Sequence, residues 1–241
     1  MDKAIYLQPY CSDNYDMVNM NTIQKLFICF FILGFVPYKA SCLGYTVGKS
    51  IISLQVGPSR YVGTFLGIAD FSKNYRSDLR DGLGWNVGYS YIFGKPGRNC
   101  NFGLGLMYQG TRYKHSAFDV SDDISMQYLA PQFILHFARK RYNIQLTYGS
   151  GFLWYKDDSG MYGKPRKVDM DEWAFNLSAG GEYYLASWCG LCAKLNWIVS
   201  ESKEYSVSYH GETWTVNNPE LSNGGGTFAP LSFTVGMNFH F

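Results

Sequence analysis

Three side chains that could support nucleophilic catalysis lie close together, at His115, Ser116 and Asp119, and a further histidine, His136, follows on a predicted strand. A histidine that takes the proton of a serine hydroxyl, and is itself oriented by a carboxylate, performs acyl transfer or hydrolysis. The spacing of these residues reproduces no motif of that chemistry, and a loop histidine beside a serine is usually solvated. We therefore predict no catalytic residue and no enzyme.

The sequence WCGLC at residues 188–192 has the spacing of a redox dithiol. Such a pair needs a helix N-terminus to stabilise its thiolate, whereas Cys189 and Cys192 fall at a predicted strand turn. Ordinary turn cysteines, or a local disulfide in an oxidising compartment, are the better interpretations. With Cys100 the predicted mature chain has an odd number of cysteines, so at least one is free unless pairing is intermolecular.

Acidic residues gather in three places, all in or beside predicted loops. Carboxylates can hold divalent cations, but solvated loop carboxylates are the better interpretation of these clusters. We predict no metal site and no cofactor. The clusters are Asp119/Asp122/Asp123, Asp157/Asp158 and Asp169/Asp171/Glu172.

The composition excludes two classes of protein. The 241 residues include 21 Lys and Arg against 19 Asp and Glu, with no basic stripe, so nucleic-acid binding is not expected. Beyond residue 40 no run approaches the roughly 18 apolar residues of a helical membrane span. Yet 46% of the residues are hydrophobic and 18% are aromatic, which leaves a barrel whose strands alternate.

The N-terminal part has the features of a targeting segment. Lys25 precedes an apolar run, LFICFFILGFV at residues 26–36, and small residues follow at Ala40 and Cys42. We assign residues 1–42 to a leader and signal peptide, with translation starting at Met20 or Met17, and residues 43–241 to one domain. Lipidation of Cys42 is an alternative, although Lys39 does not fit that motif.

The last residues, 228–241, read FAPLSFTVGMNFHF and alternate with a period of two. This pattern predicts a strand with one apolar face. A chain that ends on such a face suits a strand that closes a membrane barrel. The apolar set is Leu231, Phe233, Val235, Met237, Phe239 and Phe241.

Seven earlier segments alternate in the same way, at residues 49–57, 82–93, 100–112, 124–138, 142–156, 171–185 and 191–200. In the fourth, the apolar parity changes between Ile124/Met126/Tyr128 and Phe133/Leu135/Phe137. Because Pro131 cannot donate to a ladder, we predict a β-bulge at Ala130-Pro131. The connections alternate between long and short, as in a barrel with tall loops at one end.

The apolar face of each strand is bulky and the opposite face is rich in Gly, Ser, Asn, Gln and Thr. An eight-stranded barrel has room inside for modest side chains only, so the bulky face points outward. Two aromatic girdles are then expected. They comprise Trp85, Trp154, Trp173 and Trp197 at one rim, and Phe93, Phe102, Phe137, Tyr142, Tyr183 and Phe241 at the other. The alternative is a soluble β protein with an aromatic core.

From residue 45 onward the chain resembles the small outer-membrane β-barrels of the OmpA-like and OmpX-like families, including those of Bacteroidota. The resemblance implies an eight-stranded antiparallel transmembrane barrel in the cell outer membrane. It also implies that the barrel-assembly machinery reads the terminal strand at Phe233, Val235, Met237, Phe239 and Phe241.

Inside the barrel, one charged pair is expected. If the turn at residues 187–190 pairs Leu185 with Leu191, then Glu182 lies opposite Lys194 and both face inward. We predict a structural ion pair, with a gated pore as the alternative. Further inward polar side chains extend the network, namely Asn86, Asn101, Gln109, Gln145, Asn176 and Asn196.

The predicted function is envelope integrity, or adhesion and interaction at the surface, carried by the outer loops. A narrow solute pore and a lipid A-modifying enzyme are the alternatives. The predicted partners are outer-membrane lipid and lipopolysaccharide, whose phosphates the acidic clusters could bridge through cations, and the barrel-assembly machinery. An extracellular or host ligand is a further expected partner that the sequence does not identify, and a monomer is expected.

Overall fold

The structure is a computed structural model that describes residues 48–63, 73–94, 100–117, 119–139, 141–161, 163–202, 204–209, 211–217 and 227–241. The predicted leader and signal peptide, including Cys42, lies outside these ranges. The chain divides into two units, Met1–Lys39 and Ala40–Phe241, and the fold below is that of the second.

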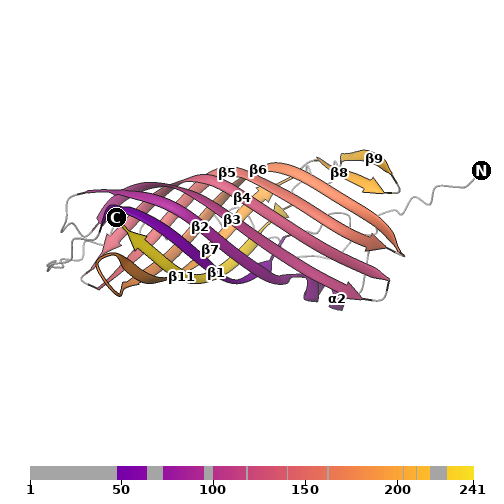
Figure 1. The fold of residues 1–241 in the computed structure, drawn as a ribbon. Helices are drawn as coiled ribbons and strands as arrows, with labels where there is room; N and C mark the ends of the chain where they lie inside the picture. Colours follow the sequence, from indigo (N-terminus) through magenta and orange to yellow (C-terminus); the bar gives the residue numbers. More distant parts are fainter. Residues whose placement is uncertain are drawn as a thin grey trace, which may run out of the picture. The chain divides into compact units, whose positions relative to one another are not determined.

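Eight antiparallel strands form a closed ring in this unit (Figure 1). Each strand pairs with the next along the chain, and the last pairs with both its predecessor and the first, which closes the sheet. The predicted fold class is therefore confirmed. The strands are β1 (Ser50–Tyr61), β2 (Asp81–Phe93), β3 (Cys100–Ala117), β4 (Val120–Ala138), β5 (Tyr142–Met161), β6 (Lys164–Tyr184), β7 (Cys189–Glu201) and β11 (Pro230–His240).

The end of the chain meets the start of β1. Ser50 N donates to Phe241 O at 3.2 Å, and Phe241 N donates to Ser50 O at 2.9 Å. We call this end of the barrel the inner end, and the end that carries the β3–β4 and β5–β6 turns the outer end. Both ends of the barrel chain thus lie at the inner end, as the even number of strands requires.

The strand alternation separates an apolar outside from an inside that is polar toward the inner end. On β11, the side chain of Val235 is 47% exposed and that of Thr234 is 1% exposed. The predicted outward aromatic side chains all lie at outward positions, and several, such as Trp173 and Phe102, are about half exposed. An apolar surface this extensive needs lipid around it, so the alternative of a soluble protein with an aromatic core is wrong.

The apolar belt ends sharply toward the outer end. Beyond Tyr108 and Gly110 on the outside of β3 come Arg112 and Lys114, and on β5 Trp154 is followed by Lys156. The same change, from apolar to charged, occurs on the other long strands. The strands β3 to β6 therefore continue well past the membrane-facing belt.

Two predicted loops are in fact paired strands. Residues 114–123 extend the β3–β4 hairpin as far as Ala117 opposite Val120, and residues 157–170 extend the β5–β6 hairpin as far as Met161 opposite Lys164. The loop predictions were wrong because ladder hydrogen bonds form between backbones whatever the side chains are. Outside the membrane both faces can be polar, so the sequence loses its alternation.

The predicted β-bulge at Ala130-Pro131 is also wrong. The β3–β4 register runs without a shift from Cys100 opposite Phe137 to Ala117 opposite Val120. Pro131 simply lies on the outer face. The apolar parity changes because the inside of the barrel becomes apolar in its outer half, where Ile124, Met126 and Tyr128 point inward and are at most 1% exposed.

The long connections contain further elements. Helix α2 (Lys73–Leu79) lies between β1 and β2, and β8 (Glu204–Tyr209), β9 (Glu212–Asn217) and β10 (Thr227–Phe228) lie between β7 and β11. Strand β8 pairs with the outer part of β6 at residues Arg166 to Asp169, and β9 pairs with β8. In the part of the chain that the structure describes, no helix has the length and apolarity needed to cross a bilayer.

Candidate functional site

At the inner end of the lumen, Glu182 accepts three hydrogen bonds. The donors are Asn143 Nδ2 at 2.7 Å, Asn238 Nδ2 at 2.8 Å and His240 Nε2 at 2.5 Å. The carboxylate is 3% exposed, and a buried charge needs such partners to be tolerated. Gly190 makes room for it, because a Cβ at that position would overlap Glu182 Oε1.

The predicted partner of Glu182 was wrong by one pairing step. The β6–β7 ladder places Glu182 opposite Cys192 and Gly180 opposite Lys194. Leu185 and Ala186 belong to the turn, where both of their amides donate to Cys189 O. A shift of two residues leaves the inward and outward faces unchanged, so the sequence pattern could not detect it.

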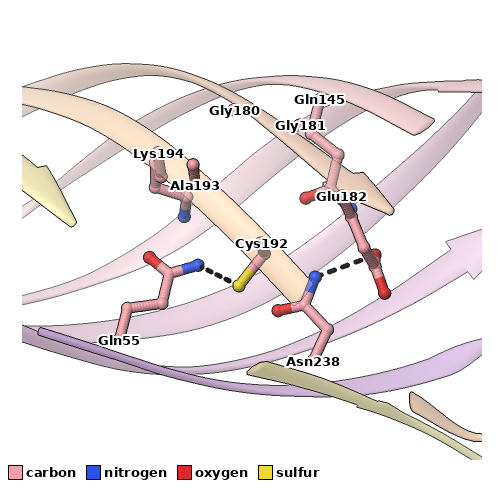
Figure 2. A pocket seen from close by; sticks show the side chains of 9 residues that line it. All are labelled: Gln55, Gln145, Gly180, Gly181, Glu182, Cys192, Ala193, Lys194 and Asn238. Atoms are coloured by element: carbon pink, nitrogen blue, oxygen red, sulfur yellow. Dashed lines mark hydrogen bonds between the residues drawn. The ribbon is translucent and has the colours of Figure 1, made fainter. Parts of the chain in front are cut away.

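Lys194 and Glu182 do line the same small pocket, together with Gln55 and Cys192 (Figure 2). Among the described residues, however, no hydrogen bond or ion pair joins them. Gln55 Nε2 donates to Cys192 Sγ at 3.1 Å, and Thr234 Oγ1 donates to Gln55 Oε1 at 3.0 Å. The neutral polar groups here fill the lumen without the predicted ion pair.

Further along the lumen, a chain of hydrogen bonds crosses the barrel from wall to wall. Asn176 Nδ2 donates to Asn196 Oδ1 at 3.0 Å, Asn196 Nδ2 donates to Gln109 Oε1, and Gln109 Nε2 donates to Ser232 Oγ at 3.1 Å. The predicted network is therefore present for these three amides. For Asn86, both side-chain polar atoms are buried without a hydrogen bond.

Above the amide chain, an apolar cluster fills the outer half of the lumen. It was not predicted as a lumen feature, and three of its members, Ile124, Met126 and Tyr128, were assigned to the apolar outer face of a strand with a bulge. Leu79 of α2 and Phe228 of β10 belong to it and are fully buried. Among its other members are Tyr61, Met107, Tyr113, Ile124, Met126, Tyr128, Leu153, Tyr155, Val168 and Ile198.

The residues considered for catalysis do not come together. His115 points into the barrel, and Ser116, the next residue on β3, points to the outside. Asp119 lies in the β3–β4 turn. His136 lies in the lumen, and neither of its ring nitrogens has a hydrogen bond.

The three described cysteines are free. Cys189 and Cys192 are buried at and near the start of β7, and Cys100 is exposed at the start of β3. No helix begins at the Cys189–Cys192 segment, which agrees with ordinary turn cysteines. The local disulfide that the sequence left open is not formed in this structure.

Strand alternation divides the predicted acidic clusters. Asp123 points outward and binds Arg112, with Nε to Oδ1 at 2.8 Å and Nη2 to Oδ2 at 2.6 Å. These hydrogen bonds lower the pKa of Asp123 to about 2. Asp122 points inward and is 4% exposed; burial raises its pKa. The neighbours Asp157 and Asp158 divide in the same way, inward and outward.

The inward carboxyls lie at the barrel mouth, above the apolar belt. Tyr75 Oη of α2 donates to Asp122 Oδ2 at 2.5 Å, and its ring packs edge-on against His115 with centroids 4.6 Å apart. Asp157 is 1% exposed, and neither carboxyl oxygen has a hydrogen bond. Burial, followed by the charge of Asp122, raises the pKa of Asp157 to about 7, while Arg166 opposes the shift.

Across the described ranges, no group of three or more His, Cys, Asp or Glu side chains is arranged to hold a metal ion.

The predicted terminal signal lies on the outer face of β11 and at the residue after it. Phe233, Val235 and Phe241 are 47–71% exposed. Their recognition by an assembly machinery stays a prediction.

No protein-family model matches the sequence, and a search of curated proteins gives no match. Solved structures do match. A major outer membrane protein from Thermus thermophilus is 10% identical, with a TM-score of 0.54, covering 80% of this chain and 99% of that one. At this level of identity the similarity concerns the fold alone.

Two further structures are less similar. Neisserial surface protein A gives 10% identity and a TM-score of 0.47 over 80% of this chain and 97% of its own. Ail, the attachment invasion locus protein of Yersinia pestis, is 12% identical, with a TM-score of 0.44, covering 80% of this chain and 100% of that one. The closed ring, the outward apolar belt and the Thermus similarity together show that this chain has the fold of an outer-membrane β-barrel protein.

Proposed function

We propose that this outer-membrane barrel acts at the cell surface as a binding protein, through the sheet that rises beyond its apolar belt. The observation that carries the proposal is strand β9. It ends the sheet, because its described pairing is with β8 alone, and residues 212–215 are exposed on both faces. In Figure 1 the β8–β9 hairpin lies beside the outer part of β6, to which β8 is paired, and β9 is paired on the far side of β8.

An open strand edge can take up a strand of another protein by backbone hydrogen bonds. The β9 edge carries no lysine or proline that would block such pairing, and its sequence is ETWTVN. Trp214 is 45% exposed and offers a large apolar contact of the kind that dominates binding energies. We infer an extended protein segment outside the cell as the partner.

The filled lumen argues against the alternative of a solute pore. The amide chain, the apolar cluster and α2 block the lumen at successive levels. We expect no steady conductance from the protein in planar bilayers. The separated positions of His115 and Ser116 likewise give no support to a lipid A-modifying enzyme.

The function can be tested with cells that display the barrel. Wild-type cells and cells in which Gly-Gly replaces residues 203–218 are compared for adherence to surfaces coated with fibronectin, laminin or collagen. We expect wild-type cells to adhere to at least one coat and the deletion to lose this binding. Equal adherence of both would contradict the proposal.

A matched control separates surface binding from envelope integrity. Cells that lack the protein are tested for growth in detergent, with and without the hairpin-deleted variant. If the variant restores growth but not adherence, the barrel also supports the envelope and the hairpin carries binding. The relation of this barrel to the OmpA-like, OmpX-like or Bacteroidota barrels stays a prediction.

A further inference from the structure

The carboxyl pair Asp122 and Asp157 at the barrel mouth has a feature that the proposed surface function does not use. Both side chains point inward from neighbouring strands, and the ladder places Asp122 opposite Ser159 and Ile124 opposite Asp157. The two carboxyls are therefore diagonal neighbours on one face. They are 4% and 1% exposed.

The partners of the two carboxyls are unequal. Asp122 accepts the hydrogen bond of Tyr75, whereas both oxygens of Asp157 lack a hydrogen bond. An ionised, dry and unpartnered carboxylate is very unfavourable, so Asp157 cannot remain charged in this arrangement without cost. A proton removes the charge, and two carboxyls this close then share one negative charge between them.

Other titratable and charged groups surround the pair on every element that packs against it. Arg166 of β6 is a cation that acts on both carboxyls. Its guanidinium can balance one carboxylate, and a second ionisation adds the repulsion between Asp122 and Asp157. Further groups on these elements are Tyr61 of β1, His115 of β3, Asp123 of β4, Tyr155 and Asp158 of β5, Tyr75, Arg76 and Asp78 of α2, and Arg80, which follows α2 and acts on Tyr61.

Helix α2 covers this pair. Tyr75 is 5% exposed and Leu79 is fully buried in the apolar cluster of the lumen. In addition to the ring contact between Tyr75 and His115, a second contact joins α2 to β3: His115 Nε2 lies 3.9 Å from Asp78 Oδ2. Water can reach the buried carboxyls from the outer side once α2 moves away.

We propose that the Asp122–Asp157 pair is a proton switch that controls the seating of helix α2 in the barrel mouth. While the pair holds one proton, α2 stays docked through Tyr75 and Leu79. When both carboxyls ionise, their repulsion and their need for water favour the state in which α2 has left the mouth. The proton passes to solvent, so the step is an ordinary acid dissociation.

The direction of the pH dependence follows from linkage. The docked state raises the pKa of Asp157 from 3.8 to about 7, so it binds more protons than the undocked, hydrated state. The contribution of this proton to docking is therefore fully present below the pKa that Asp157 has when α2 is undocked. It is lost as pH rises through the pKa that Asp157 has when α2 is docked. Each bound proton changes the docking equilibrium by up to about tenfold per pH unit.

Amide hydrogen exchange of residues 73–80 measures this equilibrium in the full barrel reconstituted in lipid nanodiscs. After correction for the pH dependence of intrinsic exchange, we expect protection to fall about a hundredfold between pH 5 and pH 8. Asp157→Asn, which mimics the protonated acid, is expected to keep its protection at pH 8. Asp158→Asn removes the adjacent outward carboxyl and should behave like wild type.

Two further measurements keep the proposal falsifiable. Asp122→Asn retains an acceptor for Tyr75 but removes the neighbouring charge, so the fall should shrink even if Asp157→Asn does not fold. Heat-dependent gel mobility confirms that each variant is folded. Equal protection of the wild type at pH 5 and pH 8, or a fall that survives in Asp157→Asn, would overturn the switch. So would protection at pH 8 that depends on millimolar Ca²⁺ and is removed by EDTA, because the occupant would then be a cation.

Discussion

At the scale of single residues, the inner end of the lumen depends on one carboxylate and its three donors. Removing Glu182 leaves Asn143, Asn238 and His240 facing an unfilled, buried space. We expect Glu182→Ala to lower the free energy of unfolding by about 3–5 kcal/mol, because the three buried donors would lose the charged acceptor of their hydrogen bonds. Guanidinium titration of the barrel in lipid vesicles measures the loss.

Lys194 provides the matched control for that change. Its ammonium has no ion pair with Glu182, so Lys194→Met should be neutral or slightly stabilising. If Lys194→Met instead destabilised the barrel as strongly as Glu182→Ala, and the double variant recovered stability, the two residues would be ion-paired in the folded protein.

Gly190 tests the same site through packing. A Cβ there would overlap Glu182 Oε1, whereas a Cβ at Gly181 has its nearest contact at 3.5 Å, with Asn143 O. We expect Gly190→Ala to cost about 1–3 kcal/mol of unfolding free energy and Gly181→Ala to stay within about 0.5 kcal/mol. Equal midpoints in guanidinium would show that Glu182 moves aside without penalty.

At the scale of the elements, the sequence pattern predicted the parts that lie within the membrane. Lipid outside and polar side chains inside impose a period of two, so the alternation alone assigns Val235 and Thr234 to opposite faces. Past the belt this contrast disappears: Asp122 and Asp123 are both acidic, yet one is buried and the other binds Arg112. The pattern there could not reveal a strand.

The strand register and the long-range packing could not be predicted from the sequence, for a different reason. A slip of two residues keeps every side chain on its own face, so Glu182 could be assigned to Lys194 as easily as to Cys192. The docking of α2 depends on Tyr75 meeting Asp122, 47 residues away. No local pattern encodes that contact.

The final strand β11 allows a test of which face meets lipid. Residues 231–239 span roughly 20 Å along a tilted strand, so Val235 falls near the middle of a band about 25 Å tall. Val235→Arg should cost about 2–4 kcal/mol because it places a charge in hydrocarbon. Refolding in vesicles followed by guanidinium titration gives the value.

Thr234 is the inward control on the same strand. Thr234→Ser keeps the hydroxyl that donates to Gln55 Oε1 and removes one methyl group, at a cost of about 1 kcal/mol. A serine variant that lost more stability than Val235→Arg would mean that the apolar face of β11 is not in lipid.

At the scale of the whole molecule, the barrel divides along its axis into levels of different chemistry. A charged and amide-rich level at the inner end is followed by an apolar level and then by the carboxyl pair and α2, while the hairpin β8–β9 extends the sheet sideways from the outer part of β6. The interior thus resists water and solutes, while groups that can respond to the medium gather at one end. This separation suits a protein that acts at a surface rather than one that conducts.

The orientation of the barrel in the outer membrane follows from the same asymmetry. Long polar extensions belong outside and tight turns inside, so the β8–β9 hairpin should face the medium and the turns at residues 94–99 and 139–141 the periplasm. Proteinase K added to intact cells should cut first within residues 203–226, because residues 212–215 of β9 are exposed on both faces and the described pairing of β9 is on one side. The inner turns should be cut only after the outer membrane is permeabilised. Fragments that end at residues 94–99 or 139–141 in intact cells would mean that the barrel is inserted the other way round, and the surface function would fail with it.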